Sequence, residues 1–132
     1  MNQTPPKRPR PPRVTGAAHL LAATGYSLQG LRRLWQETAL RHMALALPVC
    51  LGLFAVLGVG LAEYAVLAIL FLLMLAVEAL NTAIEVIIDH LAPDWAEFAR
   101  DAKDLGSLAT MCLIAANGVF VALVVYRAII TG

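Results

Sequence analysis

The stretch AVEALNTAIEVIID, residues 76–89, sets polar side chains at helical spacing among valines, leucines and isoleucines. These side chains are Glu78, Asn81, Glu85 and Asp89. On a helix of about 3.6 residues per turn, offsets of 3, 7 and 11 residues fall within an arc of roughly 80°. The polar groups therefore form one stripe on a helix whose other faces are apolar. Because a carboxylate in an apolar membrane helix is costly, we expect this stripe to face protein or water and to have a function.

The rest of the chain is apolar for its length. Of its 132 residues, 60% are hydrophobic and only 14% are charged. A soluble domain of this size buries too small a share of its surface to hide that much apolar area. The composition therefore predicts a single membrane domain, with the bilayer as a partner and no nucleic acid.

Three apolar runs, over residues 43–61, 64–89 and 105–127, are each long enough to cross a hydrocarbon core of about 30 Å. Upstream of them, residues 17–41 alternate apolar and charged positions at helical spacing, which predicts an amphipathic helix at the membrane surface. The proline- and arginine-rich residues 1–15 predict a disordered tail, so that 16–132 form the membrane domain. The predicted fold class is an all-α membrane protein with one surface helix and three transmembrane helices.

Basic residues are distributed unevenly along the chain. Seven of the ten lysines and arginines precede the first apolar run. Arg100 and Lys103 lie between the second and third runs, and only Arg127 lies at the far end of the third. Since cytoplasmic segments carry the excess of basic residues, the N-terminus and the second connection are predicted to be cytosolic. The acidic stripe then ends near the cytosolic surface.

The charged residues near that surface suggest phosphoryl-transfer chemistry. Glu78 lies at hydrocarbon depth, and no lysine or arginine within the apolar runs can pair with it, so it suits a base that takes a proton. Glu37 and Glu85 are carboxylates at headgroup level, a ligand type that Mg²⁺ prefers. Lys103, next to Asp104, can stabilise charge on a transferred phosphoryl group. Together these groups predict a site where a lipid hydroxyl meets ATP.

Other interpretations of the same residues remain open. Glu37 and Arg41 are four residues apart and could form a surface ion pair. Asp89 and the Lys-Asp pair at 103–104 could be ordinary solvated charges, and Asn81 could make an interhelical hydrogen bond. A small proton-coupled transporter would also need a glutamate in the membrane. The acids cluster at one interface, however, and there is no inverted repeat, which favours a lipid-modifying enzyme.

The segment EALNTAIE at 78–85, followed by Asp89 and by AKDLGS at 102–107, resembles the signature of the prokaryotic diacylglycerol kinases. The upstream segment ATGYS at 23–27 and the triplet GLR at 30–32 match this family as well, so that the resemblance covers residues 17 to 127. Undecaprenol kinases belong to the same family. The surroundings of Tyr26 and Trp35 are more similar to the diacylglycerol branch.

The resemblance implies a homotrimer in the bacterial inner membrane, with sites shared between subunits on the cytosolic side. It implies direct transfer of the γ-phosphoryl group of ATP, with Mg²⁺ or another divalent cation, to the primary hydroxyl of diacylglycerol. The product would be phosphatidic acid. Undecaprenol is the alternative substrate within the family.

The resemblance also implies roles for individual residues. Glu78 matches the catalytic base, and Glu37 and Glu85 match the carboxylates that hold the metal. The implied nucleotide contacts are His19, Tyr26, Glu37, Glu85, Asp94, Trp95, Ala96, Lys103 and Asp104. The implied lipid contacts are Glu78, Asn81, Ser107, Trp35 and Arg41. His19 stands where the family commonly has an arginine.

Overall fold

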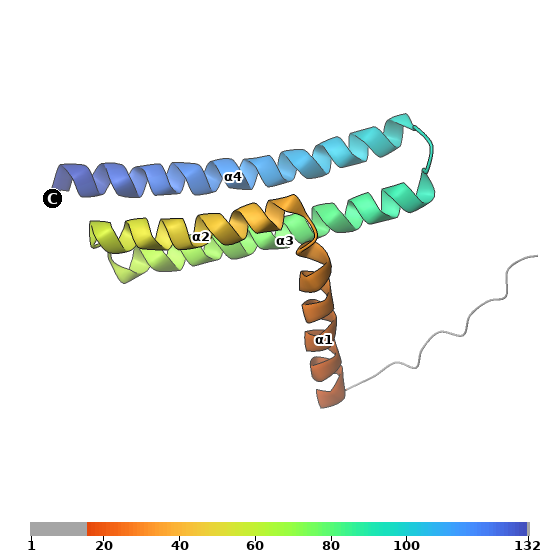
Figure 1. The fold of residues 1–132 in the computed structure, drawn as a ribbon, viewed down its shortest axis with the longest axis horizontal. Helices are drawn as coiled ribbons and strands as arrows, with labels where there is room; N and C mark the ends of the chain where they lie inside the picture. The colour runs from red at the N-terminus through yellow and green to blue at the C-terminus, as the bar shows by residue number, and fades with distance from the viewer. Residues whose placement is uncertain (1–15, 132) are drawn as a thin grey trace, which may run out of the picture. The chain divides into compact units, whose positions relative to one another are not determined.

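The computed structural model describes residues 16–131. In that range the chain forms four α-helices and no strand: α1 (Ala17–Leu34), α2 (Thr38–Leu57), α3 (Leu61–Leu91) and α4 (Glu97–Thr131) (Figure 1). Helices α2, α3 and α4 are each long and apolar enough to cross a membrane. The predicted fold class, an all-α protein with three membrane-spanning helices, is confirmed. The tail predicted over 1–15 lies outside the described residues.

The chain divides into two compact units, one ending at Arg32 and one beginning at Arg33. The first unit contains most of α1, which exposes large apolar side chains such as Leu21 and Leu28. Every described side chain that is buried belongs to the second unit, which holds α2, α3 and α4. That α1 lies on a membrane surface stays a prediction.

The sequence predicts one helix over 17–41, but the structure ends the first helix at Leu34 and begins the next at Thr38. The amide of Glu37 donates to the Leu34 carbonyl at 2.9 Å, a bond between residues three apart that tightens the end of α1. Glu37 itself has an extended backbone, with φ −78° and ψ 140°, so the first helix cannot continue through it. The predicted surface helix is therefore wrong beyond residue 34. The new helix places Leu40 and Met43 in the buried part of the second unit.

The connection between α2 and α3 is a tight turn over residues 58–60. Gly58 has φ 64° and ψ 30°, a left-handed conformation that suits glycine and ends α2. The turn lies earlier than the one predicted at 62–63, because this glycine stops the helix before Ala62 is reached. Ala62 and Glu63 instead form the first turn of α3.

The apolar core lies beside this turn. Phe54 and Leu67 are fully buried and Val124 is 6% exposed, so that each of the three long helices contributes one core residue. The ring of Phe54 contacts Tyr64 and Phe120 edge to face, with centroid distances of 5.7 and 6.0 Å. This is a favourable geometry for aromatic pairs. These contacts fix α2, α3 and α4 against one another.

The connection between α3 and α4 is shorter than residues 90–104, which separate the second and third predicted apolar runs. Only residues 92–96 lie outside the helices, and α4 begins at Glu97. Arg100 pairs with Asp101 at 2.9 Å and reaches Glu97 at 4.0 Å, so charged residues that we expect in a loop instead form the first turns of α4. Pro93 and Asp94 lie within the connection.

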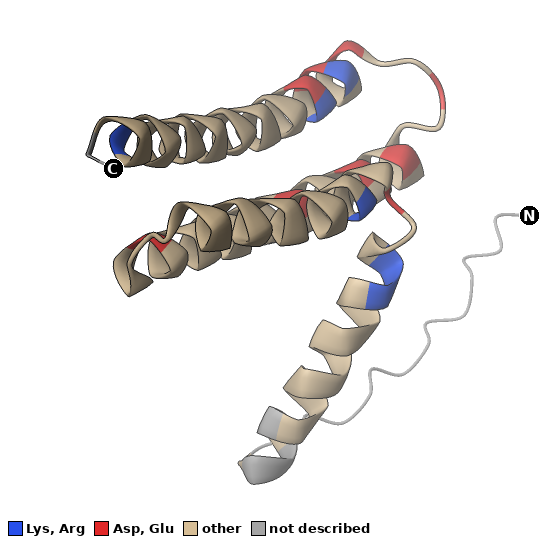
Figure 2. Ribbon diagram, turned by 60° about the vertical axis from the view of Figure 1, so that its left-hand side comes forward, with Lys and Arg blue, Asp and Glu red and all other residues tan. Residues whose placement is uncertain are grey.

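The three long helices alternate in direction, so the start of α2, the end of α3 and the start of α4 share one end of the bundle. Figure 2 shows much of the charge on α3 and α4 gathered near their connection, while the middle of the helices is largely uncharged. We call this the charged end. It is the end at which most of the predicted site residues of α3 and α4 lie.

Candidate functional site

Glu78 is a buried acid on α3, with 5% of its surface exposed. Its Oε2 accepts a hydrogen bond from Thr110 Oγ1 of α4 at 3.0 Å. The partner is a neutral hydroxyl, so this bond satisfies one carboxylate oxygen without neutralising the charge of the ionised acid. The predicted base is thus held between two helices in the apolar part of the protein.

Thr110 is the residue of this site that sequence reasoning missed. It stands 32 positions after Glu78 and interrupts an apolar run as one of several neutral polar residues. Nothing in the sequence gives the register of α4 on α3, which alone shows that this hydroxyl meets the acid. A search for hydroxyl-bearing residues in the third apolar run would have found it as a candidate only.

Asn81 continues the polar stripe one turn after Glu78. It is 8% exposed, and its Nδ2 donates to Glu85 Oε1 at 3.1 Å within the same helix. Its Oδ1 is buried and has no hydrogen-bond partner in the described part of the chain. The interpretation of Asn81 as an interhelical hydrogen bond is therefore not what the structure shows: the amide donates along α3 instead.

The backbone of α4 passes close to Asn81 at Gly106. A Cβ atom added at Gly106 would stand 2.0 Å from Asn81 Oδ1, far inside van der Waals contact. Glycine is thus required here by the close approach of the two helices rather than by its backbone angles. This contact places the AKDLGS segment directly against the polar stripe of α3.

Asp89 and Lys103 form an ion pair that joins the end of α3 to the start of α4. Asp89 is therefore not an idle solvated charge, and Lys103 is engaged with it rather than with Asp104. Both side chains are substantially exposed, at 65% and 41%. An exposed pair of this kind contributes little to stability, so its main effect is to hold the lysine near the polar stripe.

Glu37 forms an ion pair with Arg33, one helical turn before it. The alternative pairing of Glu37 with Arg41 is therefore wrong. Glu37 does form a surface ion pair, but its partner is Arg33. Arg41 donates instead to the hydroxyl of Thr38 at 3.2 Å. Glu37 also stands at the start of α2, in the extended residue that precedes the helix.

The predicted metal ligands are carboxylates on two separate elements. Between residues 16 and 131, no three His, Cys, Asp or Glu side chains converge closely enough to hold a metal ion. Mg²⁺ commonly uses only one or two protein carboxylates and takes its other ligands from phosphates and water. Carboxylates such as Glu37 and Glu85 are of the ligand type that suits a cation arriving with a nucleotide, and the described residues of this chain form no complete metal site by themselves.

The remaining predicted site residues fall into separate groups. Asp94 and Trp95 are exposed in the connection between α3 and α4, where the carbonyl of Ala96 accepts from the amides of Ala99 and Arg100 in the first turn of α4. Ser107 is exposed on α4, and Trp35 is 57% exposed in the turn after α1. His19 and Tyr26 are exposed on α1, in the first unit. None of these roles is tested by the fold.

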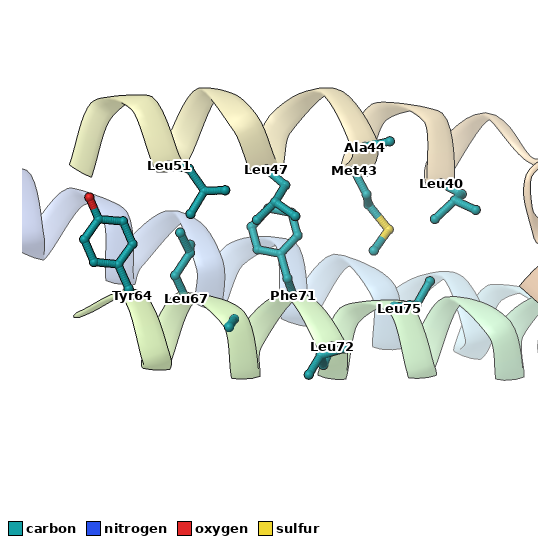
Figure 3. Close-up of a pocket in the computed structure, with 11 residues that line it drawn as sticks. Leu40, Met43, Ala44, Leu47, Leu51, Tyr64, Leu67, Phe71, Leu72 and Leu75 are labelled. Carbon is teal, nitrogen blue, oxygen red and sulfur yellow. The ribbon is translucent and has the colours of Figure 1, made fainter. Parts of the chain in front are cut away.

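Apolar cavities lie between the long helices. In Figure 3, Leu47 and Leu51 of α2 point toward Tyr64 and Phe71 of α3 across a cavity of about 410 Å³. None of the predicted site residues lines it. A second cavity, of about 590 Å³, lies among α2, α3 and α4, and Thr110 is part of its wall. The acid–hydroxyl pair is therefore next to an apolar space inside the bundle.

Known proteins are similar to this chain in sequence over most of their length and of its own. The family model described as prokaryotic diacylglycerol kinase matches residues 25–126. A diacylglycerol kinase of Sinorhizobium sp is 50% identical over 111 residues, which cover 84% of this chain and 81% of the relative. The diacylglycerol kinase of Escherichia coli K12 is 34% identical over 76% of this chain and 84% of its own length. That of Haemophilus influenzae is 33% identical over 81% and 92%.

The resemblance inferred from residues 78–107 is confirmed by these matches, which extend over most of the described helices. The comparisons do not support a transporter, because the relatives match most of the membrane domain and are named diacylglycerol kinases. The protein is thus a membrane lipid kinase that uses ATP, and the chain belongs to the prokaryotic diacylglycerol kinase family.

Proposed function

We propose that this enzyme transfers the γ-phosphoryl group of ATP to the primary hydroxyl of diacylglycerol and releases phosphatidic acid and ADP. The observation that supports this most directly is the buried carboxylate of Glu78 on an apolar helix, bonded to a hydroxyl rather than to a cation. An acid kept in such a place at the cost of burial has a use for its proton affinity.

Glu78 acts as the general base in this proposal. The lipid hydroxyl oxygen bonds to the γ-phosphorus, the bond from that phosphorus to the β–γ bridging oxygen breaks, and the hydroxyl proton passes to the Glu78 carboxylate. Thr110 occupies Oε2, and a carboxylate oxygen has two lone pairs, so the group keeps capacity to accept a proton. Asn81, Ser107, Trp35 and Arg41 are proposed to contact the lipid.

In this proposal the charged end faces the cytosol, and the nucleotide binds there. Glu37 and Glu85 would hold the divalent cation that comes with ATP, which would supply positive charge to balance the phosphates. Lys103 and Asp104 contact the nucleotide, as do His19, Tyr26 and residues 94–96. Because Glu37 is paired with Arg33 and no three ligands converge in the described chain, neighbouring subunits of a homotrimer complete the site.

Diacylglycerol is favoured over undecaprenol because the relatives that match most of this chain are named diacylglycerol kinases. Purified enzyme in detergent mixed micelles, with γ-labelled ATP and Mg²⁺, should label dioleoylglycerol and produce phosphatidic acid. Undecaprenol in the same micelles should take up little label. Preferential labelling of undecaprenol would overturn the substrate assignment and keep the kinase.

The base assignment is tested by Glu78→Gln, which keeps the shape of the side chain and removes its ability to take a proton. We expect kcat to fall by about 10²–10⁴, as for loss of a general base, with ATP binding preserved. Glu63→Gln is the matched control, since it makes the same change in the first turn of the same helix. A rate for Glu78→Gln close to that of Glu63→Gln would show that another group takes the proton.

A further inference from the structure

Thr110 is joined to the acid proposed as the base, yet it belongs to none of the motifs that identify the family in this sequence. Its hydroxyl donates to Glu78 Oε2 at 3.0 Å across the interface of α3 and α4. We propose that Thr110 is a positioning residue, which holds the Glu78 carboxylate in the orientation that accepts the proton of the lipid hydroxyl. This inference rests on the proposed role of Glu78.

A glutamate side chain has several rotatable bonds, and proton transfer requires its oxygen within hydrogen-bond reach of the reacting hydroxyl. A bond to one carboxylate oxygen fixes the plane of the group and so aims the other oxygen. Because threonine is branched at Cβ, its χ1 angle has few choices in a helix, and its hydroxyl is itself held in place. The pair therefore preorganises the base.

The neighbours of Thr110 on α4 do not replace this hydroxyl. Gly106 and Ile114, four residues before and after it, cannot donate a side-chain hydrogen bond, and Ser107, three residues before it, is exposed. Along the wall of the neighbouring 590 Å³ cavity, Thr110 is the hydroxyl-bearing residue. Removing the hydroxyl would thus leave Glu78 without the one hydrogen bond that the structure assigns to it from α4.

The hydroxyl of Thr110 donates to the neighbouring helix and not to the backbone of its own helix. A helical threonine can donate to the carbonyl four residues before it, which for Thr110 is Gly106. Here the hydroxyl donates across the helix interface to an acid that is 5% exposed. A role in fixing the acid explains why a polar side chain stands within an otherwise apolar part of α4.

Two variants separate the hydroxyl from the packing of the side chain. Thr110→Val keeps the shape and loses the donor, whereas Thr110→Ser keeps the donor and loses a methyl group. Measured in dioleoylglycerol micelles, Thr110→Val should lower kcat roughly tenfold, as for loss of a hydrogen bond to a charged group, with the KM for MgATP unchanged. Thr110→Ser should recover most of the parent kcat.

Cys112→Ser is the matched control, because it changes one side-chain atom at an exposed position two residues further along α4. It should keep the parent kcat. Equal losses in Thr110→Val and Thr110→Ser, losses no larger than in Cys112→Ser, or a rise in KM with kcat preserved would each overturn the inference. The first two would assign Thr110 to packing, and the third to substrate binding.

A double-mutant cycle with Glu78→Asp gives an independent test. Shortening the acid by one methylene group withdraws the carboxylate from Thr110, so Thr110→Val should have little further effect on kcat in that background. Fully additive losses would show that the two side chains act separately. Active Glu78→Gln would overturn the proposed function itself, whereas inactive Glu78→Gln with fully active Thr110→Val would overturn only this inference.

Discussion

The two ends of the bundle formed by α2, α3 and α4 are held together in different ways. Near the turn at Gly58, the contacts are apolar, with Phe54, Leu67 and Val124 buried together. Toward the charged end, α3 and α4 are joined by polar contacts instead, from the bond of Thr110 to Glu78 near the middle of α3 to the ion pair of Lys103 with Asp89. Membrane helices associate largely through close packing, and polar contacts between them contribute modestly. The apolar end therefore supplies most of the stability, and the polar contacts position the side chains of the proposed site.

The largest expected effect on stability comes from the apolar end. Phe54→Ala removes a fully buried ring together with its edge contacts to Tyr64 and Phe120. We expect the free energy of unfolding to fall by about 3 kcal/mol, because the lost packing leaves a cavity. The fall should appear as an earlier transition in a denaturing-detergent titration, while kcat of the folded enzyme changes little.

Val56→Ala is the matched control for that change, since Val56 lies on the same helix and is 86% exposed. It should unfold like the parent protein. If Phe54→Ala abolished kcat without lowering stability, the division between a packing end and a chemical end would be wrong.

A smaller effect on stability is expected at Gly106, where close packing of α4 on α3 meets a polar side chain. Gly106→Ala forces a methyl group against Asn81 Oδ1, and the displaced amide loses its bond to Glu85. Overpacking costs about 1–3 kcal/mol, and alanine regains about 1 kcal/mol as a better helix former, so the net loss should be of order 1 kcal/mol. Activity should fall more sharply than stability, because Asn81 and Glu85 both move.

Gly118→Ala provides the comparison on the same helix, as an added Cβ there meets nothing within 4 Å. It should be as stable as the parent or more so. The double variant Gly106→Ala/Asn81→Ala should recover stability, because the smaller residue on α3 makes room. Unchanged activity in Gly106→Ala alone would mean that the close approach does not position the polar stripe.

The smallest effect is expected at the exposed pair of Asp89 and Lys103. Asp89→Asn removes one charge of a pair whose side chains are 65% and 41% exposed. Exposed ion pairs of this kind often contribute nothing measurable, so the unfolding transition should stay within error of the parent. High salt should likewise leave the parent transition unchanged. A clear loss of stability would mean that polar contacts hold the charged end more firmly than this comparison allows.

The sequence predicts the fold class well, because long apolar runs and their flanking charges depend only on local composition. It also predicts that an acid, Glu78, lies among apolar residues at hydrocarbon depth. It fails at the break before Thr38, since the helical spacing of apolar residues runs through residues 35–37 without a glycine or proline to stop it. It also places the start of α4 too late, because charged helical residues such as Arg100 resemble a loop when only hydropathy is considered.

The sequence predicts which site residues share a face of one helix, but not which residues of another helix they contact. The stripe from Glu78 to Asp89 follows from helical spacing alone, and the structure keeps it on one helix. The partners of that stripe depend on how α4 is shifted along α3, which no local pattern specifies. Thr110 and Gly106 therefore gain their roles only in three dimensions, and Glu37 pairs with Arg33 where spacing equally allowed Arg41.

The contact between Gly106 and Asn81 also bears on how this protein can evolve. These two positions share one small volume, so a bulkier residue at 106 displaces the Asn81 side chain unless a smaller residue stands at 81. If the function of the protein requires asparagine at position 81, it also requires glycine at position 106. Among descendants of this sequence, the two sites should covary or remain unchanged together.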